Sequence, residues 1–297
     1  MDLKAARPWC GLLDVTSHIF CFVCCCWHKA HLCRTDFKNW KPVDDEFLRK
    51  GSELWRDVKT TDERKSIESL YGTRYSEFWR LPYWKPSRMV AVEPMHTIFL
   101  ILEQRFFRDA LGLDDPQSKR VKLLERVQEV VHQVITPAWS SRPPSDIGLP
   151  KAGTLKADHW RTLFTIHLPL ALLSLWKEEL PLAAADAAQM TSVLETGMAL
   201  SCASIVMIKN TLTLQRRDLF RNLLRRHVLG LQQNFPGFIL PTHHLAFHLY
   251  DFMDLLSVVQ EFWNFAFEGF IGKIQRTPTN HVIGESICSV FQLCISG

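Results

Sequence analysis

The feature that most constrains this chain is a long central region in which apolar residues recur with the period of an α-helix. The pattern runs through residues 96–112, 118–136, 155–178, 183–208 and 211–234, with few glycine or proline interruptions. Stripes of this kind bury one side of each helix against its neighbours. We therefore expect a mainly α fold built around a helical block.

Further helices are predicted ahead of this block. Acidic residues at the start of 44–70, followed by apolar residues at helical spacing, predict a helix there. A second helical stretch follows, which Thr61 or Asp62 would cap and Gly72 would end. The aromatic, proline-containing residues 80–95 predict a loop that leads into a short extended segment.

The cysteines and histidines divide the chain into three parts. Residues 1–43 are rich in both, residues 44–235 contain most of the expected helices, and residues 236–297 contain a histidine cluster followed by apolar sequence. In the last part we expect an apolar helix at 252–271 and one more at 280–295. Two chemically distinctive segments therefore flank the helical block.

Composition is that of an ordinary globular protein, with 47% hydrophobic and 22% charged residues in a chain of 297. The formal charge of +4 permits a nucleic-acid partner if basic residues gather on one face, but does not establish one. The longest apolar runs, His18–Trp27 and Phe164–Trp176, are shorter than the roughly 20 residues that span a bilayer. We expect no membrane partner, no secretory signal and an intracellular, reducing location.

The cysteines favour metal binding over disulfides. Six of the nine lie in residues 10–33, and an odd, clustered set in a reducing compartment is typical of metal ligands or free thiols. Cys21 and Cys24 form a C-x-x-C motif, whose thiolates can share one Zn²⁺ across a tight turn. Cys25, Cys26 and Cys33 are rival ligands, and a buried Cys-rich segment without metal is the plain alternative.

A second pair of ligands follows 220 residues later. His244 and His248 are four residues apart, so on a helix both imidazoles face the same way. With Cys21 and Cys24 they would complete a four-ligand structural zinc site that joins the two ends of the helical block. His243 is a rival ligand in the distal cluster.

Two alternatives to this long-range site are open on sequence alone. His28 and His31 could complete a local, finger-like site with Cys21 and Cys24. The distal histidines could also be polar surface residues at the start of a helix, with no metal between them.

One carboxylate stands out near the C-terminus. Glu268 lies in a very apolar segment twenty residues after His248, and buried acids are rare unless they are paired or bind a metal. The plain alternative is that Glu268 points to solvent from an amphipathic helix. Glu261 and Glu285 are rival acids nearby.

Taken in chain order, a set of short motifs resembles the CACTA (En/Spm) family of cut-and-paste DNA transposases, as found in fungal genomes. The ordered set covers nearly the whole chain. The matching stretches are Asp2–Arg7, Gly11-Leu12, Ser17–Cys24, Tyr71–Glu77, Leu81–Trp84, Pro94–His96, Phe99-Leu100, Gly153–Arg161, Phe235–Gly237, His244–His248, Phe267–Gly272 and Gln275–His281. The catalytic subunit of the V(D)J recombinase is similar in layout.

The resemblance implies an RNase H-like DDE nuclease with a large, mostly helical insertion between its second and third acidic residues. Asp2 precedes Cys21 by nineteen residues, and Glu268 follows His248 by twenty, as in that layout. Asp2 and Glu268 would be catalytic residues that bind Mg²⁺ or Mn²⁺, two ions of which promote strand cleavage and transfer at phosphorus. Structural Zn²⁺ would be held by Cys21, Cys24, His244 and His248.

The resemblance also implies partners and a location. The partner would be DNA, namely transposon ends, the chain could form a homo-oligomer, and the location would be the nucleus. Lys273 and Arg276, together with Arg216, Arg217 and Arg221, would contact phosphates. A solvated basic helix face is an equally good reading of these side chains.

This chain departs from the family pattern in two ways, of which the missing upstream acid limits the expected activity. The family's first catalytic aspartate and the first strands of its RNase H-like sheet should lie upstream of Asp2, whereas this sequence starts at Met1. Few short strands are therefore expected, and Glu93 stands where the family usually has aspartate. We expect a fragment or relic of a transposase that is inactive alone. The alternative is a domesticated, non-catalytic, zinc-linked helical module that binds DNA or protein.

Overall fold

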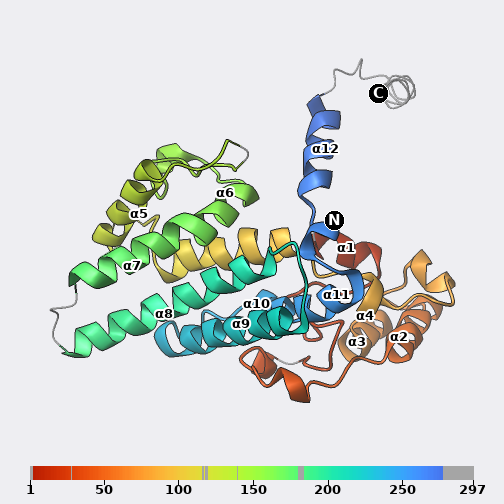
Figure 1. The fold of residues 1–297 in the computed structure, drawn as a ribbon. Helices are drawn as coiled ribbons and strands as arrows, with labels where there is room; N and C mark the ends of the chain where they lie inside the picture. Colours follow the sequence, from red (N-terminus) through yellow and green to blue (C-terminus); the bar gives the residue numbers. More distant parts are fainter. Residues whose placement is uncertain are drawn as a thin grey trace. The chain divides into compact units, whose positions relative to one another are not determined.

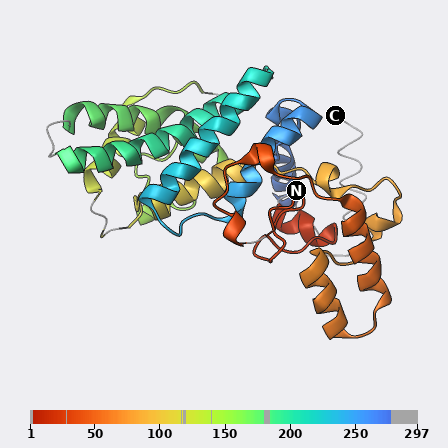
Figure 2. The same ribbon diagram turned by 90° about the horizontal axis from the view of Figure 1, so that it is seen from below.

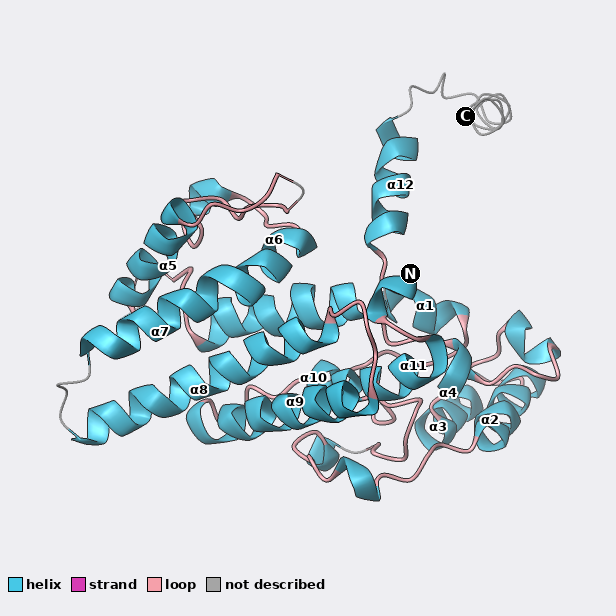
Figure 3. Ribbon diagram, in the orientation of Figure 1, coloured by secondary structure: helices cyan, strands magenta, loops and turns pink. Residues whose placement is uncertain are grey.

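Helices and loops make up the described part of the chain, with no β-strand among its residues (Figure 3). The computed structural model describes residues 3–27, 29–115, 117, 120–138, 140–179 and 184–276. Two isolated bridges, Leu12 with Thr73 and Cys24 with Pro42, are the β-type pairings found there. The mainly α class is confirmed, and none of the few expected short strands forms in the described residues.

The first part of the chain forms short helices around the C-x-x-C motif. They are α1 (Leu3–Trp9), α2 (Asp45–Asp57), α3 (Thr61–Tyr71) and α4 (Pro86–Met89), with 3₁₀ turns at Lys29–His31, Phe37–Asn39 and Glu77–Arg80. Asp44 caps α2 through the backbone N–H of Glu46. Thr60, rather than Thr61 or Asp62, caps α3 in a capping box with Glu63. Gly72 ends α3 in the left-handed conformation (φ 72°), as predicted.

The central block contains the predicted long helices. They are the π-helices η4 (Met95–Glu103) and η5 (Phe106–Ala110), α5 (Val121–Gln133), the 3₁₀ turn Pro150–Ala152, α6 (Ala157–Thr162), the π-helix η7 (Leu163–His167), α7 (Leu168–Glu179), α8 (Ala184–Met207) and α9 (Leu214–Asn234). In both views α8 and α9 run side by side (Figures 1 and 2). Gly230 of α9 permits this close approach, because an added Cβ would lie 2.2 Å from the Thr196 Oγ1 of α8.

The C-terminal helices differ from the prediction of one helix over 252–271. The chain instead forms α10 (Pro241–Phe247), α11 (Leu249–Leu256), a 3₁₀ turn at Val259–Glu261 and α12 (Phe265–Arg276). Ser257, at φ 84°, ends α11 in the left-handed region, which an apolar periodicity does not reveal. The helix expected at 280–295 lies outside the described residues.

The chain divides into two compact units. The first covers Met1–Phe262 and the second covers Trp263–Gly297, so the boundary lies within the third predicted part, 236–297. The first unit contains the central block, the Cys-rich segment and the distal histidines. The described helix of the second unit is α12.

One helix is long and apolar enough to cross a membrane by length and composition alone. It covers Ala187–Met207 of α8, and half of its apolar window is buried inside the fold. Core helices pass the same test, so this observation is weak evidence for a span. The length of unbroken apolar runs misses this stretch, because Gln189, Glu195 and several serines and threonines interrupt its apolar residues.

Candidate metal centre

The C-x-x-C motif forms a tight turn whose backbone donates to one of its own sulfurs. The Cys21 Sγ accepts from the backbone N–H groups of Val23 (3.4 Å) and Cys24 (3.3 Å). The buried Arg7 holds the preceding residues in place, since its guanidinium donates to the carbonyls of Leu13 and Phe20. The protein's own hydrogen bonds and packing thus fix and bury both thiols.

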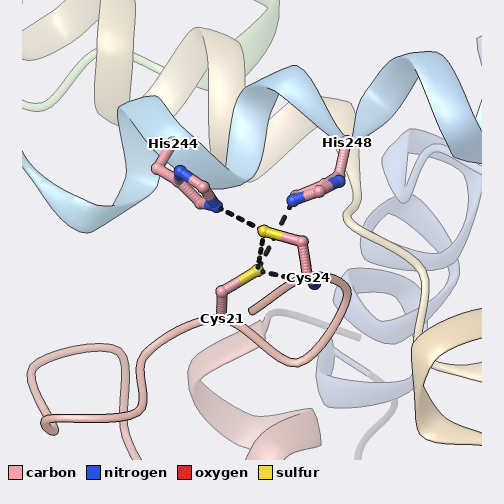
Figure 4. A group of neighbouring side chains, drawn as sticks. All are labelled: Cys21, Cys24, His244 and His248. Carbon is pink, nitrogen blue, oxygen red and sulfur yellow. Dashed lines mark hydrogen bonds between the residues drawn. The ribbon is translucent and has the colours of Figure 1, made fainter. Parts of the chain in front are cut away.

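The distal histidines reach this turn from the junction of α10 and α11. His244 lies on α10, and His248 lies between the two helices. Figure 4 shows both imidazoles pointing at the two sulfurs from the opposite side. Both histidines are almost fully buried, at 1% and 2% exposure.

The spacing of the four ligand atoms fits a tetrahedral metal site. The Sγ atoms of Cys21 and Cys24 are 3.6 Å apart. The Cys21 Sγ lies 3.4 Å from the Nε2 of His248, and the Cys24 Sγ lies 3.3 Å from the Nε2 of His244. Zinc bonds of about 2.3 Å to sulfur and about 2.0 Å to nitrogen give tetrahedral edges of about 3.8 Å between sulfurs and about 3.5 Å from sulfur to nitrogen. The group could therefore hold a metal such as zinc.

Groups behind the histidines orient the two rings. The His248 Nδ1 and the Asp251 Oδ2 are 2.8 Å apart, so the Nδ1–H donates to the carboxylate and leaves Nε2 free for a metal. The Trp40 ring stacks on the His244 ring at 4.3 Å between centroids. Phe20 meets the same imidazole edge-on at 5.1 Å. A carboxylate behind the ring, as for His248, is typical of a metal-binding histidine.

The charges of the site favour metal binding. Burial would raise the pKa of Cys21, but the hydrogen bond from Cys24 and the charge of His248 bring it well below its usual range. Burial would likewise lower the pKa of His248, but Cys21 and Asp251 raise it to about 9. The hydrogen bond to Cys21, together with burial, raises the pKa of Cys24, so the two thiols share a proton that a bound cation would replace.

Comparison with known proteins gives no match for this chain: no family model, curated protein or solved structure corresponds to it. The chemistry of the site therefore rests on its own residues.

The structure separates the true ligand candidates from their sequence rivals. The ring of His243 turns away, and its Nδ1 accepts from the backbone N–H of Leu240 at 3.0 Å. Cys25 is exposed and donates to the Pro42 carbonyl, and neither it nor Cys26 belongs to the four-ligand group. His28 lies outside the described residues. His244 and His248 supply the two nitrogen ligands, in place of the histidines at 28 and 31 that a local finger-like site would use.

Of the two acids implied by the resemblance, the described residues include Glu268. Asp2 lies outside the described residues. Glu268 lies on α12 in the second unit and is exposed, as are the neighbouring apolar residues Phe267 and Phe270. Lys273 and Arg276 occupy the last turn of the same helix, where the Arg276 Nε donates to the Gly272 carbonyl at 2.8 Å.

Two arginines that the sequence offered as phosphate contacts prove to be internal. The side chains of Arg217 and Arg221 are only 13% exposed, and they pair with Asp254 and Asp251 respectively. Both guanidiniums also lie over the Tyr250 ring. They connect α9 to α11 behind the metal centre, which a charge count along one helix could not show.

Glu93 has a clear structural role that the sequence left open. Its buried carboxylate accepts from the backbone N–H groups of Met95 (2.8 Å) and His96 (2.9 Å) at the start of η4. The same carboxylate lies 2.7 Å from the His96 Nδ1. Glu93 thus caps the first helix of the central block.

Proposed function

We propose that this chain is the helical insertion and C-terminal part of a CACTA-type, RNase H-like DDE transposase, joined by a structural zinc. The observation that supports the proposal is the meeting of Cys21 and Cys24 with His244 and His248 across 220 residues. The resemblance names this ligand set. A local zinc finger would need neither distal histidine at the sulfurs.

The role of the zinc in this proposal is to fix where two segments leave the helical block. Asp2 lies nineteen residues before the first ligand, and Glu268 lies twenty residues after the last one. The zinc would therefore hold together the two stretches of chain from which these acids follow in sequence. In the parent family these acids would bind Mg²⁺ or Mn²⁺, which supply charge stabilisation for displacement at phosphorus.

A second candidate is a domesticated, non-catalytic module that binds DNA or protein. One observation favours it: the whole zinc group lies in the first unit, while Glu268 belongs to the second. The clamp can therefore form without the catalytic acid.

Zinc content tests the shared core of both candidates. We expect one zinc per wild-type chain and none in Cys24→Ser or His248→Ala, because each change removes a ligand. Cys25→Ser and His243→Ala are matched controls that change a neighbouring cysteine and histidine outside the group, and they should keep the metal. Full zinc in His248→Ala would show that the ligands are local and would end the long-range proposal.

Plasmid nicking with Mg²⁺ or Mn²⁺ separates the two candidates from an active enzyme. The resemblance supplies two catalytic acids within these 297 residues, and two-metal chemistry in the family uses three. We therefore expect no cleavage by the purified chain. Cleavage that disappears in Glu268→Ala would contradict this expectation.

A further inference from the structure

A short segment of the first unit, residues 34–40, lies between the metal centre and solvent. The Trp40 ring stacks on the His244 imidazole at 4.3 Å between centroids, and it is tilted against the His248 imidazole at 5.6 Å. Both imidazoles are almost fully buried, whereas Trp40 is only half-buried. The indole therefore shields the two nitrogen ligands from water.

The same segment packs on the helix that carries His244. The Phe37 ring lies 5.8 Å from the Phe247 ring between centroids, and Trp40 meets that phenyl ring nearly edge-on at 5.5 Å. The Arg221 guanidinium of α9 lies over the Phe37 ring at 4.5 Å. Contacts between rings, and between a cation and a ring, are each modest in strength, so the segment rests on the site through a few separable contacts.

Asp36 organises this segment from within. Its carboxylate accepts from the Arg34 guanidinium at 2.8 and 2.7 Å and from the Trp40 Nε1 at 3.2 Å. The backbone N–H groups of Asn39 and Trp40 donate to the carbonyls of Asp36 and Phe37. These hydrogen bonds join parts of the segment to one another rather than to the metal centre, so the segment can move as one piece.

The chain is anchored on either side of the segment. Before it, the Gln232 side-chain amide of α9 donates to the Cys33 carbonyl at 2.6 Å. After it, the backbone N–H of Cys25 donates to the Lys41 carbonyl at 2.9 Å. Fixed ends with an internally cross-linked middle are the arrangement of a flap, which opens by turning about those ends.

We propose that residues 34–40 form a flap over the metal centre, and that Trp40 closes it and thereby controls access to the bound zinc. The inference rests on the proposed function, in that the site holds zinc. All four ligand residues are buried beneath the closed flap. Trp40 is not one of the four ligands, so opening the flap would expose the ion and leave its bonds intact.

A flap and a ligand differ in how zinc release depends on a chelator. While the flap is closed, a chelator must wait for it to open, so the release rate does not rise with chelator concentration. Without the flap, the chelator attacks the bound ion directly, and the release rate rises with its concentration. A change that only weakens a zinc bond speeds release without adding this dependence.

The experiment follows zinc release in stopped flow from the zinc-loaded 297-residue chain, at increasing excess of the chromophoric chelator 4-(2-pyridylazo)resorcinol. We expect a rate independent of chelator concentration for the wild type. Trp40→Ala should release zinc about tenfold faster and in a concentration-dependent way, because it removes the stacked ring that closes the flap. Trp9→Ala is the matched control, since it removes an exposed tryptophan outside the segment, and it should behave as the wild type.

Two further variants keep the test open if Trp40→Ala does not load zinc. Trp40→Phe keeps an aromatic ring at this position but loses the indole N–H that Asp36 accepts, so its release should lie between those of Trp40→Ala and the wild type. Asp36→Asn loosens Arg34 and Trp40 from an exposed position without removing a packed ring. It should show the same concentration dependence to a smaller extent.

Three results would reject the flap. They are a release rate in Trp40→Ala that stays independent of chelator concentration, equal rates in Trp40→Ala and Trp9→Ala, and a concentration-dependent rate in the wild type, which would show that the ion is already accessible. Each of these leaves one zinc per wild-type chain, so the proposed zinc-linked function would stand without the flap. Absence of zinc from the wild-type chain would overturn both.

Discussion

His243 and His244 are neighbours in sequence and are equally buried on α10, but their side chains point at different groups. His244 points at the Cys24 thiol, within a group that can hold a metal. His243 lies against His227 of α9, with 6.0 Å between ring centroids and no thiol beside it. Two adjacent residues of one helix therefore face the metal centre and a packed helix interface respectively.

The two histidine pairs also differ in charge. Burial lowers the pKa of His227 to about 4 and that of His243 to about 3, so both are neutral. His248 is as deeply buried, yet Cys21 and Asp251 raise its pKa to about 9. Burial alone thus predicts neither the protonation state nor the role of a histidine; the neighbouring group decides both.

Metal removal should cause the largest loss of stability, and it should act on the region of His244 and His248 rather than on that of His227 and His243. Structural zinc contributes about 10–16 kcal/mol of apparent binding free energy in small zinc domains at neutral pH. We expect a chelator to lower the thermal midpoint strongly and to expose both the residue 21–24 turn and the α10–α11 junction to proteolysis. Protection near His227 on α9 should persist longer. Simultaneous loss of protection throughout the first unit would show that the two regions unfold together.

The sequence predicts an interaction well when its residues lie close together in the chain, and poorly when they lie on different helices. The spacings of Cys21 with Cys24 and of His244 with His248 are local, so the sequence offers both pairs as ligand candidates, while the choice among their rivals needs the three-dimensional structure. Asp251 escapes notice, because a carboxylate three residues past a histidine is common on helices. The pairing of His227 with His243 depends on how α9 packs on α10, and no spacing along one helix reports that.

The helices follow the same division. Periodicity predicts the long members of the block, from η4 to α9, since each buries an apolar stripe. It merges α11 and α12 into one helix, because apolar residues continue through the left-handed turn at Ser257. Packing partners and single-residue backbone conformations are what the sequence pattern does not contain.

Mild acid should lower the free energy of unfolding, because His227 is buried as a neutral side chain. An unfolded histidine has a pKa near 6.5, and the folded value is about 4, so only the unfolded state takes up this proton between those values. The stability that neutral His227 gives to the folded state is fully present above pH 6.5. It is lost as the pH falls toward 4, by about 1.4 kcal/mol per pH unit. His227→Gln should reduce the acid slope of urea-unfolding free energy by one proton. Equal acid slopes in the wild type and in His227→Gln would refute neutral burial of His227.

The smallest effect should come from the carboxylate that orients His248. Asp251→Asn keeps a hydrogen-bond acceptor for the Nδ1–H but removes the negative charge, so the imidazole becomes a weaker zinc ligand. We expect zinc affinity to fall about 10- to 100-fold, measured by competition with a chromophoric chelator. Asp254→Asn is the matched control, since Asp254 lies on the same helix and pairs with Arg217 rather than with a ligand. If both variants lose zinc affinity equally, the effect comes from the ion pairs between α9 and α11. The difference in charge between the two buried histidine pairs would then come from the cysteine thiols alone.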